Sequence, residues 1–168
     1  MFKLPFIIPE EDLELNLILL LMIVNELNTT STGKYILNNE RLQLYFYLVR
    51  NPHILNKLLS LLSKKQIELK SYELSSFKAN RNNIETLYDT TSVMNYLQLL
   101  VSKQLIDVKY DEKIGFIYFT TSKAHEILEQ VNSIYFKRVS IFINKLKQTR
   151  STTLSAMNTN LKKILHKG

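Results

Sequence analysis

The sequence predicts a mainly helical α+β protein, and three observations lead to this class. Apolar residues recur at the three-to-four spacing of amphipathic helices along most of the 168 residues. Only three glycines and three prolines occur, which argues against a many-stranded, loop-rich fold. The stretch "LIDVKYDEKIGFIYFT", from Leu105 to Thr120, places two short apolar runs around a polar tip and predicts a β-hairpin between two helices.

The first predicted helix begins near Pro9 or Glu10 and ends at about Leu27, before the turn-rich stretch "NTTSTG". Acidic residues in its first turn suit the positive end of the helix dipole. Its run "LNLILLLMIV" is intensely apolar but only ten residues long, whereas a membrane span takes roughly 20. We therefore expect a buried core helix here, and no membrane contact.

Two shorter helices are predicted over residues 40–49 and 52–63. Asn38 or Asn39 is the expected N-cap of the first of them, because a side-chain amide oxygen there can accept a backbone N–H. The two helices meet at "RNP" and have the proportions of a helix–turn–helix pair.

The polar stretch "KKQIELKSYELSSFKANRNN" is the best candidate for a junction between two halves. We predict a helix–turn–helix-like N-terminal half over residues 1–75, a second half over 76–148 and a basic amphipathic tail helix over 149–168. Residues 35–37 and 67–69 are candidates for short strands.

The second half is predicted to run helix, hairpin, long helix. The predicted elements are a helix at 92–103, strands at 106–110 and 115–119, one long helix at 121–148, and a last helix at 154–166. The expected buried side of the first of these helices is Val93, Tyr96, Leu97, Leu100 and Val101. The expected stripe of the long helix is Ile127, Val131, Ile134 or Tyr135, Val139, Phe142 and Leu146.

This half, "SVMNYLQLLVSKQLIDVKYDEKIGFIYFTTSKAHEIL", resembles the winged-helix pattern. That pattern consists of a recognition-position helix, a two-stranded wing and a helix that starts with Thr-x-x-(Gly/Ala)-x-x-(Ile/Leu). Thr121, Ala124, Ile127 and Leu128 match its last part. The resemblance bears on the fold and says little about the ligand.

The chain as a whole is similar to the middle components of bacterial ABC three-component systems. An apolar opening helix, the segment "LNNERLQLYFYLVRNP" and the winged-helix half carry this resemblance over most of residues 10–148. These small subunits are encoded beside an SMC/Rad50-like ATPase in anti-phage defence operons of the Lamassu type. The resemblance implies a non-catalytic adaptor that joins the ATPase to an effector, often a nuclease.

The sequence offers little evidence for a catalytic or metal-binding site. The three histidines lie far apart and none has a partner at metal-ligand spacing; cysteine is absent, and no glycine-rich phosphate loop occurs. We expect no enzyme activity, no metal, no cofactor and no small-molecule substrate. With no signal peptide evident, the expected compartment is the cytoplasm.

The predicted wing carries mixed charge. Carboxylates on a wing oppose phosphate contact, because each cancels part of the gain from counterion release. The helix over 92–103 offers Asn95 and Gln98 but a single cation at its far end. We therefore predict a protein contact for the wing, with these candidate residues: Asp107, Lys109, Tyr110, Asp111 and Lys113.

Positive charge gathers at the C-terminal end. Residues 130–168 contain eight Lys and Arg and no carboxylate, whereas residues 1–129 contain 14 basic and 15 acidic residues. Contact candidates for a partner protein or for non-specific DNA binding are Lys145, Lys147, Arg150, Lys162 and Lys163. The alternative function is a stand-alone winged-helix transcription regulator that binds DNA as a homodimer through the long helix.

Overall fold

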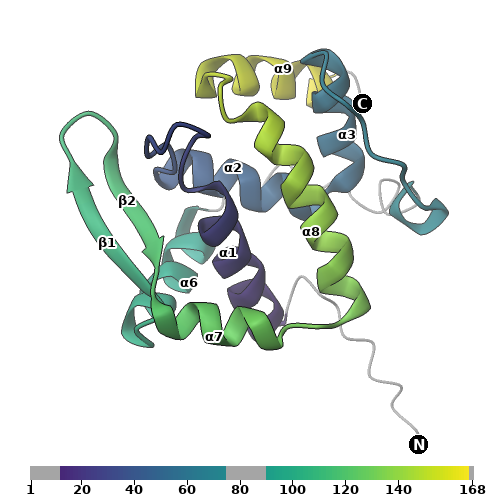
Figure 1. Cartoon of the computed structure of the whole chain (residues 1–168). Helices are drawn as coiled ribbons and strands as arrows, with labels where there is room; N and C mark the ends of the chain where they lie inside the picture. Colours follow the sequence, from purple (N-terminus) through teal and green to yellow (C-terminus); the bar gives the residue numbers. More distant parts are fainter. Residues whose placement is uncertain (1–11, 75–89, 167–168) are drawn as a thin grey trace, which may run out of the picture.

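The protein folds as a set of helices with one antiparallel β-hairpin, and the computed structural model describes residues 12–74 and 90–166 (Figure 1). The helices are α1 (Leu13–Leu27), α2 (Asn39–Arg50), α3 (Pro52–Leu61), α6 (Thr90–Ser102), α7 (Ser122–Gln130), α8 (Ile134–Leu146) and α9 (Leu154–His166). The strands are β1 (Ile106–Asp111) and β2 (Gly115–Thr120), and a short 3-10 helix, η1 (Lys147–Thr149), follows α8. The predicted mainly helical α+β class is confirmed.

Local capping sets the start of the first helices. In α1, Asp12 is the N-cap and its Oδ1 accepts the N–H of Leu15 at 3.0 Å. The start expected near Pro9 or Glu10 lies outside the described residues. In α2, the predicted N-cap Asn38 is confirmed, because its Oδ1 accepts the N–H of Arg41 at 3.0 Å.

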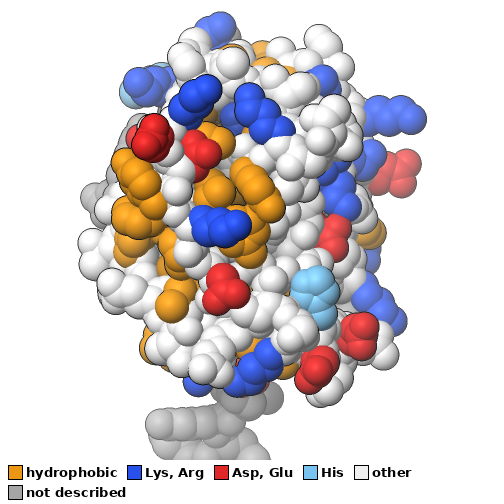
Figure 2. Space-filling view, turned by 60° about the vertical axis from the view of Figure 1, so that its left-hand side comes forward, with side chains coloured by type: hydrophobic (Ala, Val, Ile, Leu, Met, Phe, Trp, Pro, Cys, Tyr) orange, Lys and Arg blue, Asp and Glu red, His pale blue; other side chains and the backbone are white. Residues whose placement is uncertain are grey.

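The hairpin extends from one side of the body, the side that Figure 2 brings forward (Figures 1 and 2). Its register pairs Ile106 with Thr120 and Tyr110 with Phe116. At the tip, the Oδ1 of Asp111 accepts the N–H groups of Lys113 and Ile114 at 2.8 and 3.0 Å. Gly115 then closes the turn at φ +89°, a conformation that glycine adopts without a Cβ penalty. The predicted hairpin is therefore present, although the winged-helix assignment itself stays a prediction.

The single long helix predicted over 121–148 is wrong. The chain leaves the helix after Gln130 and starts a new one at Ile134, so α7 and α8 run in different directions (Figure 1). Ser133 adopts an extended conformation and its Oγ accepts the N–H of Phe136 at 3.2 Å, which makes it the N-cap of α8. The continuous apolar spacing across residues 127–135 hid this turn.

The break changes which side chains are buried. Ile134 and Tyr135, one of which was expected in the apolar stripe, are 83% and 40% exposed, while Phe136 is buried. Val101 of α6, also expected to be buried, is 41% exposed. Helices α8 and α6 instead bury the side chains that pack into the core.

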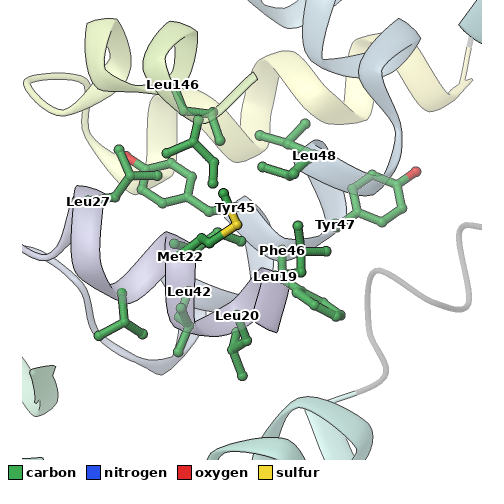
Figure 3. Close-up of a cluster of buried hydrophobic side chains, with 14 of the residues drawn as sticks. Leu19, Leu20, Met22, Leu27, Leu42, Tyr45, Phe46, Tyr47, Leu48 and Leu146 are labelled. Carbon is green, nitrogen blue, oxygen red and sulfur yellow. The ribbon is translucent and has the colours of Figure 1, made fainter. Parts of the chain in front are cut away.

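The hydrophobic core lies where α1, α2 and α8 meet (Figure 3). The apolar run of α1 is buried there, as predicted for a core helix, and Leu20, Ile23 and Val24 have no exposed surface. Figure 3 shows Leu19, Met22, Tyr45 and Leu146 among the side chains that fill this space. Within the described residues, no helix has both the length and the apolar character needed to cross a bilayer.

The last helix, α9, begins and ends where the sequence predicts and packs on α3. Its stripe residues Met157 and Leu161 are buried in the same core as those of α1 and α2. These two apolar side chains of α9 are thus covered by the protein's own body, whereas Ile164 is only partly buried.

Three further boundaries differ from expectation. Residues 67–69 form no strand, although Ile67 is buried and its N–H donates to the Oδ1 of Asn56 at 2.6 Å. Residues 35–37 contribute one isolated bridge, between Thr29 and Tyr35. The helix expected over 52–63 ends at Leu61, because Ser63 adopts a positive φ of 54°.

Candidate interaction surfaces

The base of the hairpin is fixed to the body by side-chain hydrogen bonds. The phenol of Tyr118 donates to the Oδ1 of Asn39 at 2.5 Å, and burial holds the pKa of that phenol above its ordinary value. At the end of β2, the hydroxyl of Thr120 donates to the Oδ1 of Asn25 at 3.1 Å. These contacts join β2 to α1 and α2, so the outer half of the hairpin is presented from a rigid base.

One face of the outer hairpin is apolar and exposed. Val108, Tyr110 and Phe116 are 40%, 69% and 51% exposed. The pairing of Tyr110 with Phe116 and of Val108 with Tyr118 puts their side chains on the same face of the sheet. The rings of Tyr110 and Phe116 meet edge-on, with centroids 5.4 Å apart. Figure 2 shows hydrophobic side chains gathered on this side of the molecule.

The opposite face and the tip carry the charged candidates. Asp107, Lys109 and Lys113 are exposed, and the Nζ of Lys109 lies 5.5 Å from the centroid of the Phe119 ring. The carboxylate of Asp111 accepts hydrogen bonds from backbone N–H groups of the tip. The structure therefore brings the five predicted wing residues together on one hairpin but divides them between two faces, with only Tyr110 on the apolar one.

Two members of the apolar face, Val108 and Phe116, were missed by the sequence reasoning. The alternation of apolar and polar residues in each strand could have indicated them. The alternation does not predict which part of the hairpin packs against the rest of the protein, because that depends on the contacts of β2 with α1 and α2.

The exposed side of α6 is weakly suited to DNA. The helix Thr90–Ser102 contains no Lys or Arg. Asn95 and Gln98 are exposed as expected, but Leu99 and Val101 beside them are 37% and 41% exposed. Phosphate contacts normally supply the register for base reading, and this helix offers no cation to make them.

The five predicted basic residues do not form one patch. The Nζ of Lys147 makes a 2.6 Å ion pair with Glu26 of α1, and Arg150 donates to the carbonyl of Thr29 at 3.1 Å. Lys145 is half-buried on α8. Lys162 and Lys163 are exposed near the end of α9. Lys147 and Arg150 thus join the C-terminal part to α1 and to the loop that follows it, whereas the two lysines of α9 remain on the surface.

A groove of about 290 Å³ lies between α8, the start of α3 and residues 72–73. Its floor includes the buried ion pair in which Arg138 binds both carboxylate oxygens of Glu73, at 2.6 and 2.7 Å. This hydrogen bonding lowers the pKa of Glu73 below its ordinary value, although burial opposes the shift. Ile134 and Tyr135 line the groove and are exposed because of the helix break.

Comparison with known protein families identifies the family of this chain. A family model described as ABC-three component (ABC-3C) system Middle Component 4 matches residues 27–159, about four fifths of the chain. No curated protein and no solved structure shows a significant match to the chain. The matched segment contains α2 through η1 and the hairpin, and it ends within α9.

Proposed function

Because this chain belongs to the Middle Component 4 family of ABC-three component systems, we propose that it is a non-catalytic adaptor subunit. Membership of a multi-component system implies protein partners. The proposed partners are an SMC/Rad50-like ATPase and an effector, of which a nuclease is the expected kind, in an anti-phage defence complex of the Lamassu type. The proposed cellular site is the cytoplasm.

The exposed apolar face of the hairpin is the observation that carries this proposal. Aromatic side chains that project from a rigid base are typical anchors of protein interfaces, since they bury a large area at a low cost in conformational entropy. Tyr110 and Phe116 are such a pair, and their exposed fractions of 69% and 51% leave most of that area to be covered by a partner. Asp107 and Lys113 at the margins suit the polar rim of such an interface.

Contact with DNA is proposed only as a non-specific contribution from surface lysines. Lys162 and Lys163 could meet phosphates, whereas the side chains of Lys147 and Arg150 already have partners within the protein. Two or three phosphate contacts give a weak, strongly salt-dependent affinity. The alternative reading as a stand-alone DNA-binding regulator gains no support from α6, whose described residues include no cation.

Co-purification tests the proposal. The chain is expressed together with the proteins encoded by its two neighbouring genes, and the amount of each recovered on the tagged chain is measured. We expect an SMC/Rad50-like ATPase to be recovered, and Tyr110→Asp to reduce its recovery about tenfold, because a buried carboxylate replaces an aromatic anchor.

Ile141→Asp is the control. Ile141 is 42% exposed on α8, away from the hairpin, and it does not line the groove between α8 and residues 72–73, so its change should leave recovery unaltered. Both variants should retain the melting temperature of the wild type. The adaptor role is rejected if the chain alone forms a dimer that binds one operator tightly while no neighbouring protein is recovered with it.

A further inference from the structure

A second groove, separate from the hairpin, lies between α3 and α9. Its volume is about 320 Å³, and Lys57, Ser60 and Leu61 of α3 face Lys163 and Ile164 of α9 across it. The two helices are brought together here although about a hundred residues separate them in the sequence. Leu61 is 50% exposed and Ile164 is half-buried, so the groove has an apolar strip that solvent reaches.

The two helices that form this groove carry basic residues and no carboxylate. Residues 50–67 and 130–168, which include α3 and α9, contain no Asp or Glu. Lys57 and Lys163 line the groove, and Lys162 follows on the exposed surface of α9. Lys64 and Lys65 come directly after α3. A ligand that lies in this groove therefore meets positive potential from both helices.

The apolar strip decides between the chemical classes of anion that could bind. Phosphate groups of a nucleic acid gain from lysines but bury no apolar surface, so they would leave Leu61 exposed to water. A polypeptide can supply both parts, with carboxylates for the lysines and an apolar side chain for the strip. The hydroxyl of Ser60, also at the groove, can bond to a peptide group.

We propose that the α3–α9 groove docks an acidic segment of a partner protein, with carboxylates at Lys57 and Lys163 and an apolar side chain over Leu61. This proposal rests on the proposed adaptor function, because the acidic segment belongs to one of the proteins that the chain joins. The groove is a second contact surface in addition to the hairpin, and it lies on a different part of the body. An adaptor with two separate surfaces can hold two partners, or two parts of one partner, at once.

Photo-crosslinking in the co-expressed complex tests the groove. p-Benzoylphenylalanine replaces Leu61, the complex is irradiated, and the crosslinked peptide is identified by mass spectrometry. We expect the crosslink to fall in a segment of a partner subunit that has Asp or Glu on either side of an apolar residue. A crosslink to DNA, to a second copy of this chain, or to a segment without carboxylates overturns the proposal.

Two charge reversals on neighbouring residues separate a docked peptide from general electrostatic attraction. Lys163→Glu and Lys162→Glu change the same charge in the last turns of the same helix, but only Lys163 lines the groove. We expect Lys163→Glu to weaken partner affinity about tenfold and Lys162→Glu by about twofold or less. Equal effects of the two variants on partner affinity would contradict a docked acidic segment. The same conclusion would follow if Lys163→Glu reduced the affinity for phosphatidylserine vesicles or duplex DNA as much as it reduces the affinity for the partner.

The failure of this proposal differs from the failure of the adaptor function. If the partners are recovered and Tyr110→Asp reduces their recovery, while Lys163→Glu and Leu61→Ser do not, the adaptor function stands and the groove proposal is wrong. If no neighbouring protein is recovered by the wild type, both are wrong. Leu61→Ser is expected to fold, because the Leu61 side chain is half exposed.

Discussion

The guanidinium of Arg41 donates a 2.8 Å hydrogen bond to the backbone carbonyl of Thr152 and so ties α2 to the segment before α9. Its other amino group donates to the hydroxyl of Tyr45 at 3.0 Å and contacts the sulfur of Met157 at 3.8 Å. Arg41 is 8% exposed, and all of these partners are neutral. The C-terminal helix is therefore built into the body by a buried polar contact as well as by its apolar stripe.

Loss of this contact should destabilise the whole protein. We expect Arg41→Ala to lower the free energy of unfolding by about 2–4 kcal/mol, because it opens a cavity and leaves the carbonyl of Thr152 without its donor. Urea unfolding followed by circular dichroism measures the change. Arg50→Ala on the same helix serves as the control. Arg50 lies 5.0 Å over the Phe46 ring at a partly exposed site, so we expect a loss of at most about 1 kcal/mol there.

The ion pair of Glu73 and Arg138 predicts a dependence of stability on pH. The pKa of Glu73 is lower in the folded protein than in the unfolded chain, so the folded state binds fewer protons at acidic pH. The pair's stabilisation is fully present above the unfolded pKa and is lost as the pH falls through the folded pKa. Urea unfolding should show a larger difference between wild type and Glu73→Gln at pH 7 than at about pH 3.

The exposed carboxylate of Glu129 gives the control for this experiment. Glu129→Gln should unfold like the wild type at both pH values, because charges at exposed sites contribute little to stability. If wild type and Glu73→Gln differ equally at both pH values, the ionised carboxylate does not stabilise the fold.

The N-cap of α8 should be measurable on its own. Ser133→Ala removes the acceptor for the N–H of Phe136 and should cost about 1 kcal/mol of stability. Ser133→Asp keeps an acceptor and adds a negative charge at the helix N-terminus, so we expect it to match or exceed the wild type. Asn132→Ala, one residue earlier and exposed, controls for the loss of a polar side chain. Thermal unfolding of the three variants checks this, and equal melting temperatures would mean that Ser133 caps nothing.

Gly115 sets the shape of the hairpin tip. Its φ of +89° is unfavourable for any residue with a Cβ, although a Cβ built there meets no atom within 4 Å. We therefore expect Gly115→Ala to cost about 1 kcal/mol or more through backbone strain alone, and Gly115→Asn to cost less, since Asn tolerates positive φ better. Hydrogen exchange of the β1 and β2 amides reports the change locally. A variant that leaves this exchange unaltered would show that the tip tolerates other conformations.

Much of the fold follows from local sequence signals. The hairpin, the boundaries of α9 and the N-cap Asn38 were predicted within one or two residues, because turn chemistry, capping and apolar spacing act over a few positions. The same spacing misled the prediction at residues 131–133. There an apolar side chain fell every three or four positions on both sides of the break, and the capping serine gave the only contrary signal.

The candidate surfaces could be predicted in part. Residues 107–113 were identified as an exposed, charge-balanced hairpin, but the apolar face formed by Val108, Tyr110 and Phe116 was not. The groove between α3 and α9 had no sequence signature, because neither helix by itself shows a hollow. The position of Leu61 beside α9 became known only from the packing of the two helices.

The sequence by itself determined the order and type of most elements, the buried nature of α1 and the excess of positive charge after residue 130. Tertiary structure alone decided which of those charges are bonded within the protein and which stay on its surface. Lys147 pairs with Glu26 across 121 positions and Arg41 binds Thr152 across 111, and no local pattern encodes such pairings. The physical reason is that periodicity and capping depend on neighbours along the chain, whereas exposure and ion pairing depend on which helices pack together in three dimensions.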